Sequence, residues 1–468
     1  MRMPAEIATL RTSRPEVRVV HLGLGAFHRA HQAWYTERAN AGGEDWGIAA
    51  FTGRSPDAAL ALSRQDGVYT LIERGPEEDR AVVISSIVEA HDGADAEAWR
   101  SALASPRVAV LTLTVTEAGY HADADGGLDG SDPSIRADIA ALLAGGPAAT
   151  APGRIVDGLR ARRAAGAGGI AVVSCDNLPD NGQVTQSVVM GVARAVDAEL
   201  ADWIAANASF VSTMVDRITP ETTAEDRVIA GRLVGVDDDV PVVAEPFSEW
   251  VLSGAFPGGR PAWEAAGARF VDDIVPYEQR KLWLLNAGHS LLAYRGLLAG
   301  LDTIDEAMTD AGIVAELEEL WREAREVLPL GESELDAAVS ALHERFTNGR
   351  IRHTLRQIAR DGSHKLPVRI VAPLRRRLAN GLDVGRAQAG TLAAWGACLV
   401  RFGPTDDSSS SLAAALGAGP DAGPDTGDHA GVSILEAIAS ELAGDAAVRR
   451  AVAERFSTLL TESVPGKA

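Results

Sequence analysis

The sequence predicts an α/β protein with two domains, a doubly wound sheet domain over residues 1–270 and a mostly α-helical domain over residues 271–468. Two observations support this division. Up to about residue 270, short apolar runs rich in β-branched residues alternate with helical stretches, which favours a parallel sheet covered on both faces. Beyond that point, apolar residues recur only at helical spacing. A length of 468 residues also exceeds that of one ordinary domain.

Four strands are expected in the first part, with helices between them. Each predicted strand is an apolar run bounded by Gly or polar residues, and the four runs are 17–22, 46–51, 108–116 and 169–175. Two of the intervening helical stretches are 95–104 and 134–143.

The second part contains six stretches with apolar residues at helical spacing and no convincing strand. The six stretches are 277–298, 313–327, 332–346, 368–378, 387–400 and 434–442. The segment 406–431 is rich in Gly, Ser, Pro and Asp, so we expect a mobile surface loop there.

The composition argues against several classes of protein. A net charge of −21 makes the chain a poor candidate for binding the phosphate backbone of nucleic acid. It has no run of about 18 apolar residues that could span a membrane, and its N-terminus lacks the apolar stretch of a signal peptide. Cys175 and Cys398 form no C-x-x-C pair, which favours a reducing compartment and disfavours a structural zinc site. We therefore expect a cytoplasmic protein without a metal.

Lysine is rare in this chain. Of 44 basic residues only three are Lys, namely Lys281, Lys365 and Lys467, while the others are Arg. Lys can lose its proton when it is buried, whereas Arg effectively cannot. A role in proton transfer is one reason why an internal Lys would not be replaced by Arg, and chance is the alternative.

A glycine turn follows the first predicted strand. Gly23 and Gly25 precede a predicted helix, which is the context of a dinucleotide site in a Rossmann-type domain. The third glycine of that fingerprint is missing, because His28 stands in its place, so an ordinary strand–helix turn is the alternative. His28, Arg29 and His31 lie in the first turns of the helix, where they could contact phosphate or simply cap the helix.

An acidic residue after the second strand is expected to bind the ribose hydroxyls. Asp57 is the candidate, although it lies 34 residues beyond Gly23, which is later than usual. A carboxylate there would repel a 2′-phosphate and favour NAD over NADP. Arg54 nearby works against this preference.

The segment 277–290 gathers polar side chains. In an α-helix with about 100° per residue, Lys281, Glu278, His289 and Asn286 share one arc of about 140°. Asn and His can donate hydrogen bonds to an oxygen where charge develops, and a Lys can supply or accept the proton once burial, and His289 if charged, lower its pKa. An ordinary packed helix is one alternative. The Tyr277-x-x-x-Lys281 pair of short-chain dehydrogenases is another, disfavoured because it lies 254 residues beyond Gly23.

Seven strings occur in order along most of the chain. They are HLGLGAFHRAHQ (21–32), TLTVTEAGY (112–120), SCDNLPDNG (174–182), MVDRITP (214–220), EPFSEWV (245–251), Lys281 with Asn286 and His289, and DGSHKLP (361–367). Together they resemble the mannitol dehydrogenase family, the long-chain polyol and uronate dehydrogenases. The resemblance implies an NAD-binding sheet domain, a helical domain, substrate in the cleft between them, and no metal. Members are often monomeric, so a monomer is expected.

The resemblance also implies a role for individual residues. Lys281 would be the acid/base, Asn177 and Asn286 would hold the reacting oxygen, and His289 would bind substrate. Further substrate contacts would come from Asp216 and Lys365, while Glu278 would assist proton exchange with solvent. The cofactor would be NAD, with NADP less favoured, and its expected contacts are Gly23, Gly25, Phe27, His28, Arg29, Asp57 and Thr116.

Within the family, the motifs favour a sugar acid as substrate. Mannitol-type enzymes place an Arg eight residues before the lysine of the DGS-x-K string, where this chain has Gln357. The strings 357–369 and 345–353 resemble fructuronate reductases instead, which implies D-mannonate and D-fructuronate. A carboxylate needs a nearby cation, for which Lys365, Arg352 or Arg369 are candidates. The alternatives are a mannitol 2-dehydrogenase, another polyol dehydrogenase and, more remotely, a non-catalytic dinucleotide or sugar-acid sensor, which the complete Lys/Asn/His set disfavours.

Overall fold

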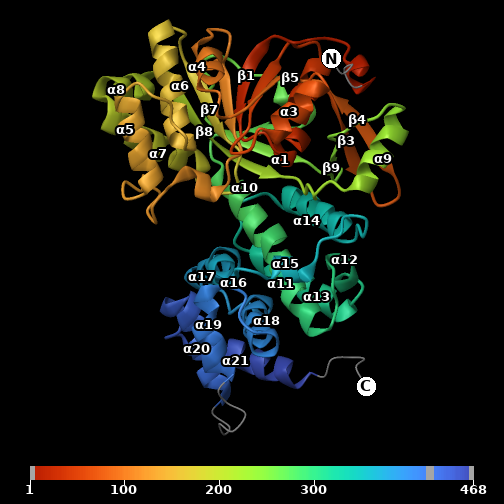
Figure 1. Cartoon of the computed structure of the whole chain (residues 1–468). Helices are drawn as coiled ribbons and strands as arrows, with labels where there is room; N and C mark the ends of the chain where they lie inside the picture. Colours follow the sequence, from red (N-terminus) through yellow and green to blue (C-terminus); the bar gives the residue numbers. More distant parts are fainter. Residues whose placement is uncertain (1–5, 418–425, 463–468) are drawn as a thin grey trace. The chain divides into compact units, whose positions relative to one another are not determined.

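The computed structural model describes residues 6–417 and 426–462. The chain forms two compact units, Met1–Ile274 and Val275–Ala468. The first is an α/β unit and the second is helical (Figure 1).

An eight-stranded sheet forms the centre of the first unit, in the order β11-β10-β8-β7-β6-β1-β2-β5. All neighbours from β5 to β8 pair in parallel, and their order is that of a Rossmann-type sheet, which reverses between β1 and β6. β10 runs antiparallel to β8. The bounds are β1 Val17–Leu22, β2 Gly47–Phe51, β5 Ile87–His91, β6 Val110–Leu113, β7 Ile170–Ser174, β8 Ala208–Asp216, β10 Glu249–Ser253 and β11 Arg269–Phe270.

Helices cover both faces of this sheet, which explains why every residue of central strands such as β2 and β7 is buried. Neighbouring residues of β1 belong to different cores, with Val19 packing on one face and Val20 on the other. The core around Val19 includes α1 Ala26–Ala30, α2 Gln32–Ala41 and α3 Asp57–Arg64. The core around Val20 includes α4 Ala96–Ala104, α5 Pro133–Leu143, α6 Ala151–Ala165, α7 Asn181–Val196 and α8 Ala198–Asn207.

A smaller three-stranded sheet with the order β4-β3-β9 belongs to the same unit. Its strands are β3 Tyr69–Arg74, β4 Asp79–Ile84 and β9 Val242–Ala244, and α9 Ala224–Val234 packs against it through Ala230. The distant segments that form this sheet were not expected as strands.

The predicted elements of the first unit are largely confirmed. The expected strands at 17–22, 46–51 and 169–175 correspond to β1, β2 and β7 within one residue at each end, and both named helices are present. Each of these helices begins at an Asp cap, because Asp95 accepts the amide of Ala98 and Asp132 accepts that of Ser134. The strand expected over 108–116 is shorter: β6 ends at Leu113, after which the amides of Val115 and Thr116 bond a side chain instead of a ladder.

The second unit is helical, as expected, and in its described residues the only β pairing is an isolated bridge between Thr303 and Thr354. No helix in the described part of the chain is both long and apolar enough to cross a bilayer. The helices are α10 Val275–Arg280, α11 Ala287–Leu298, α12 Ile304–Ala307, α13 Ala311–Arg325, α14 Glu332–Phe346, α15 Leu355–Ile358, α16 Gly362–Leu366, α17 Ala372–Ala379, α18 Arg386–Phe402, α19 Ser410–Gly417, α20 Thr426–Ile438 and α21 Ala446–Thr461.

Two predictions for this unit need correction. The segment expected as one regular helix over 277–298 contains a π-helical stretch at Lys281–Asn286, and a second stretch lies at Pro367–Val371. The loop expected over 406–431 is wrong for the described residues, which form a 3-10 turn, α19 and the start of α20. Asp406 caps this turn by accepting the amide of Ser409, and Leu412 and Ala430 are buried in the core. The remaining residues, 418–425, lie outside the described part.

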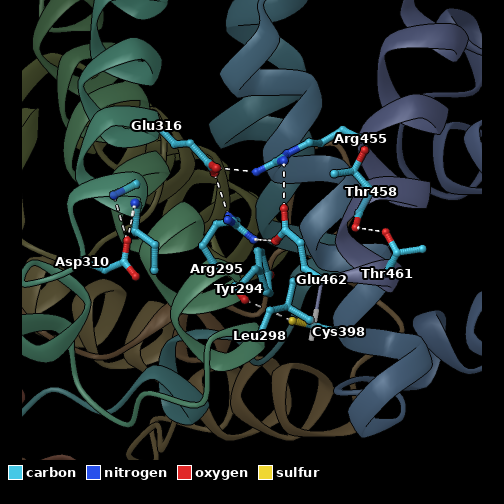
Figure 2. A network of polar contacts seen from close by, with 12 residues as sticks. Tyr294, Arg295, Leu298, Asp310, Glu316, Cys398, Arg455, Thr458, Thr461 and Glu462 are labelled. Atoms are coloured by element: carbon cyan, nitrogen blue, oxygen red, sulfur yellow. Dashed lines mark hydrogen bonds and ion pairs between the residues drawn. The ribbon is translucent and has the colours of Figure 1, made fainter. Parts of the chain in front are cut away.

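Four charged side chains connect α11, α13 and the end of α21 (Figure 2). Arg295 contacts Glu316 at 2.8 Å and Glu462 at 3.3 Å, while Arg455 contacts both of the same carboxylates. These side chains are partly exposed, so each pair contributes little and the apolar core dominates the stability of the unit.

Candidate active site

The glycine turn at the end of β1 is shaped by the neighbouring strands. The amides of Gly23 and Leu24 both donate to the carbonyl of Phe51, the last residue of β2, at 2.9 Å. Gly23 has φ +107°, and a Cβ there would lie 2.0 Å from the carbonyl oxygen of Thr114. The turn therefore requires glycine at this position for reasons of its own geometry.

Gly25 is different, because the protein itself leaves room for a side chain there. Its backbone is extended, and a Cβ would have only the carbonyl oxygen of Gly23 within 4 Å, at 3.6 Å. The turn lies at the carboxyl end of β1, where the strand order reverses, which is where doubly wound sheets bind dinucleotides. An open glycine backbone at this place fits the close approach of a pyrophosphate.

Asp57 lies at the start of α3, just after β2. Its side chain is exposed and accepts a hydrogen bond of 2.6 Å from the hydroxyl of Ser55, and Arg54 is exposed nearby in the sequence. Both residues thus follow β2, the strand next to the glycine turn.

The side chains that follow the glycines mainly pack against, or donate hydrogen bonds to, other parts of the protein. The ring of His28 is completely buried and stacks on His21 with centroids 3.3 Å apart, so it does not face a ligand as expected. Arg29 donates to the carbonyl of Val240 at 2.5 Å. Phe27 is half-buried and stacks on His31 at 5.1 Å. Burial lowers the pKa of His21 to about 3 and that of His28 well below its usual value, so both rings are neutral.

Three further predicted residues lie at the carboxyl ends of neighbouring strands. Thr116 follows β6, Asn177 follows β7, and Asp216 is the last residue of β8. Because these strands are parallel, the three residues and the glycine turn share one edge of the sheet. Thr116 and Asn177 are exposed, whereas Asp216 is buried. Residues more than 190 positions apart in the chain are thereby collected at one edge.

Asp176, next to Asn177, was not singled out from the sequence. Its carboxylate is buried and accepts hydrogen bonds from three groups around Thr116. An Asp directly after an apolar strand, beside a candidate catalytic Asn, is a sequence signal that could have identified it.

The lysine segment of the second unit departs from α-helical geometry where the predicted catalytic residues lie. Lys281 and Asn286 are the first and last residues of the π-helical stretch, so the arc calculated with about 100° per residue does not apply across it. Side chains from elsewhere bind carbonyls of this stretch: Trp321 donates to that of Leu284 at 3.0 Å, and Arg369 donates to that of Asn286 at 3.3 Å. Lys281 is half-buried, as is Glu278 one turn earlier. Such π-helical stretches occur frequently at functional sites.

His289 follows in α11 and is almost fully buried. Its ring lies 4.8 Å from that of Phe346 and 5.1 Å from that of His353. Burial, reinforced by the charges of His353, Arg345 and Arg369, lowers its pKa well below the usual value. His289 is therefore neutral at pH 7, so the condition under which its charge would lower the pKa of Lys281 is not met.

Lys365 and Arg369 form a cationic group one helical turn apart. Lys365 donates to the carbonyl of Arg360 at 2.7 Å and lies 3.8 Å from the carboxylate of Asp361. Burial and the charge of Arg369 lower the pKa of Lys365. Arg369 also donates to the hydroxyl of Ser290 at 3.2 Å and makes no ion pair with an acidic residue in the described chain. Arg352, the third candidate for binding a carboxylate, is exposed.

The described residues contain no group of three or more His, Cys, Asp or Glu side chains that could hold a metal ion.

Two protein families match the chain. The first, described as the Mannitol dehydrogenase Rossmann domain, matches residues 17–265, and the second, described as the Mannitol dehydrogenase C-terminal domain, matches residues 273–415. The first match alone covers more than half of the 468 residues.

Several known proteins are similar over most of their length. D-mannonate oxidoreductase of Escherichia coli (strain K12) is 42% identical, with 79% of this chain and 77% of that protein covered. Mannitol 2-dehydrogenase of Cereibacter sphaeroides is 41% identical, with 83% and 81% covered. Among solved structures, the Pseudomonas fluorescens mannitol 2-dehydrogenase ternary complex with NAD and D-mannitol is 34% identical, with a TM-score of 0.78 and 98% and 94% covered.

Proposed function

Because this chain belongs to the mannitol dehydrogenase family, we propose that it is an NAD-dependent oxidoreductase that interconverts D-mannonate and D-fructuronate. The family supports an oxidoreductase that acts on polyols or sugar acids with a nicotinamide cofactor. The choice of a sugar acid is supported by the similarity to D-mannonate oxidoreductase and by the cationic group of Lys365 and Arg369.

The first unit would hold the cofactor at the carboxyl edge of its sheet. The backbone at Gly23 and Gly25 would receive the pyrophosphate, and Thr116 would contact the cofactor from the end of β6. Asp57 would accept the ribose hydroxyls, which favours NAD because a carboxylate repels a 2′-phosphate. When bound, the nicotinamide supplies or accepts the hydride.

Lys281 would transfer the proton. In reduction its ammonium protonates the alkoxide, and in oxidation its neutral amine removes the proton from the hydroxyl. The carboxamides of Asn177 and Asn286 would donate to the reacting oxygen, where negative charge develops. His289, which is neutral, would bind a substrate hydroxyl. Asp216 and Glu278 would contact substrate and relay the proton, respectively. The assignment combines residues of both units, so variants in either unit should affect turnover of the same substrate.

The observation that carries the choice of substrate is the half-buried guanidinium of Arg369. It donates to a backbone carbonyl and a hydroxyl, and it has no acidic partner in the described chain. A half-buried cation gains most from a carboxylate that it can bind through two N–H groups. Lys365 one turn earlier, which lies 3.8 Å from Asp361, adds a second positive charge, whereas a neutral polyol would leave the charge of Arg369 uncompensated.

A mannitol 2-dehydrogenase is the second candidate, which the 41% identity to such an enzyme supports. The two candidates differ in one substrate group, because only the sugar acid carries a carboxylate. Rates of NADH oxidation with fructuronate, tagaturonate and fructose, measured side by side, separate them. We expect kcat/KM for a ketouronate to exceed that for fructose at least tenfold, and the reverse order would favour the mannitol enzyme.

The variant Arg369→Gln tests the carboxylate contact directly. A hydrogen bond to a charged group contributes about 1.5–3 kcal/mol, so KM for fructuronate should rise about 10- to 150-fold while KM for fructose changes little. Arg375→Gln is the control, because Arg375 is an exposed arginine that pairs with Glu441 at 2.8 Å. Equal losses on both substrates would mean that Arg369 only supports the π-helical stretch.

A further inference from the structure

Thr116 has a backbone conformation that its residue type normally avoids. Its φ is +67° and its ψ is 160°, a region populated almost only by glycine. A β-branched residue there costs on the order of 1–3 kcal/mol and persists only when its surroundings hold it in place. The strain lies at the carboxyl end of β6, beside the glycine turn of β1.

The carboxylate of Asp176 holds this strained turn. Its Oδ1 accepts the amide of Thr116 at 2.8 Å, and its Oδ2 accepts the amide of Val115 at 3.0 Å. The same Oδ2 accepts the hydroxyl of Tyr120 at 2.6 Å, and that hydroxyl also contacts Ser174. One side chain at the end of β7 therefore fixes the backbone at the end of β6.

This carboxylate is buried without a cationic partner in the described residues. Asp176 is 9% exposed, and burial raises its pKa in spite of the three donors. Burying a charge that is compensated only by neutral donors is costly and needs a reason. The three hydrogen bonds offset part of this cost and fix the backbone of Val115 and Thr116.

The backbone of Asp176 is anchored as well. Its carbonyl accepts the side-chain amide of Asn181 at 2.9 Å and the amide of Leu178 at the same distance. Asn181 in turn exchanges hydrogen bonds of 2.7 and 2.9 Å with the backbone of Thr213 in β8. Asn177 thus projects from a segment tied to the strands on both sides.

We propose that Asp176 is a positioning residue. It clamps the Val115–Thr116 turn to the end of β7, and it thereby sets where the Asn177 carboxamide lies relative to the carboxyl edge of the sheet, where the cofactor would bind. The inference rests on the proposed function in the role given to Asn177. The carboxylate of Asp176 bonds only protein groups in the described chain, so it acts through its neighbours.

The variant Asp176→Asn tests the clamp with almost no change of shape. One oxygen is replaced by an NH₂ group, which faces an amide donor and cannot accept its hydrogen bond. We expect kcat to fall at least tenfold with KM changed less than threefold, because an interaction made only in the transition state is weakened. In the Asn177→Ala background, Asp176→Asn should lower kcat less than twofold further.

Asp138→Asn is the matched control. Asp138 is also buried and also accepts two backbone amides and one hydroxyl, from Ala149 and Thr150, but it lies in α5. We expect it to lower the melting temperature about as much as Asp176→Asn does and to leave kcat within twofold. Equal losses of kcat in both variants, or additive losses of Asp176→Asn and Asn177→Ala, would overturn the proposal.

Hydrogen exchange measured by mass spectrometry tests the clamp without any substrate. Peptides that cover 113–120 and 175–180 should both exchange at least tenfold faster in Asp176→Asn than in the wild type. In Asp138→Asn, the exchange rates of these peptides should equal those of the wild type. Unchanged exchange in Asp176→Asn would refute the clamp. A wild type that turns over no ketouronate or polyol would instead refute the proposed function, while the exchange result still decides on Asp176.

Discussion

Replacing Gly25 by alanine should separate the stability of the glycine turn from its capacity to bind a dinucleotide. The extended backbone at Gly25 accepts any residue, and the added methyl group would meet only the Gly23 oxygen, at 3.6 Å. The free energy of unfolding should therefore change by less than about 0.5 kcal/mol. A pyrophosphate packed on that backbone would have to move away, so Kd for NADH should rise at least tenfold, or about 1.4 kcal/mol.

Titration of NADH fluorescence and thermal unfolding measure the two quantities on the same samples. Gly130→Ala is the control, because a Cβ at Gly130 would meet nothing within 4 Å and its φ is not positive. Gly23→Ala provides the contrast: its Cβ would lie 2.0 Å from the Thr114 oxygen, so it should lower the melting temperature clearly. NADH binding by Gly25→Ala at wild-type affinity would refute the placement of the cofactor over this turn.

Two other predictions concern charge. Burial depresses the folded-state pKa of His21 to about 3, so the unfolded chain binds a proton at this site at a higher pH than the folded chain does. As the pH falls from 6.5 to 3, the free energy of unfolding should therefore decrease by up to about 1.4 kcal/mol per pH unit. Urea denaturation at pH 7 and pH 5 should show this slope reduced in His21→Asn, and an unchanged slope would assign it to other groups. Asp57→Ala should raise KM for NAD and reduce the preference for NAD over NADP, which steady-state kinetics with both cofactors would reveal. An unaltered cofactor preference would contradict the placement of Asp57 at the ribose site.

Local patterns predicted the elements that local sequence determines. The strands β1, β2 and β7 are predominantly apolar runs, and their burial on both faces makes such runs recognisable. The three-stranded sheet joins segments as far apart as Tyr69 and Val242, and the pairing of such distant segments cannot be inferred from either one alone. The loop predicted over 406–431 was wrong because small polar residues suggested it, whereas Leu412 and Ala430 pack in the helical core.

The motifs name candidate residues, whereas only the fold shows how these residues are arranged. The motifs identified Thr116, Asn177 and Asp216, and the parallel strand order then placed them on one edge. The helical wheel failed at Lys281–Asn286, because it assumes a regular α-helix. The contribution of Asp176 depends on Val115, Thr116 and Tyr120, which reach its carboxylate only after the two strands have paired.

The turnover of Lys281→Arg tests the central claim most directly. Arginine keeps the positive charge but effectively cannot give up its proton, so the variant separates proton transfer from charge. If Lys281 is the acid/base, kcat with the best ketouronate should fall at least about 100-fold while Kd for NADH stays within twofold. A kcat within threefold of the wild type, with unchanged NADH affinity, would contradict the assignment of Lys281.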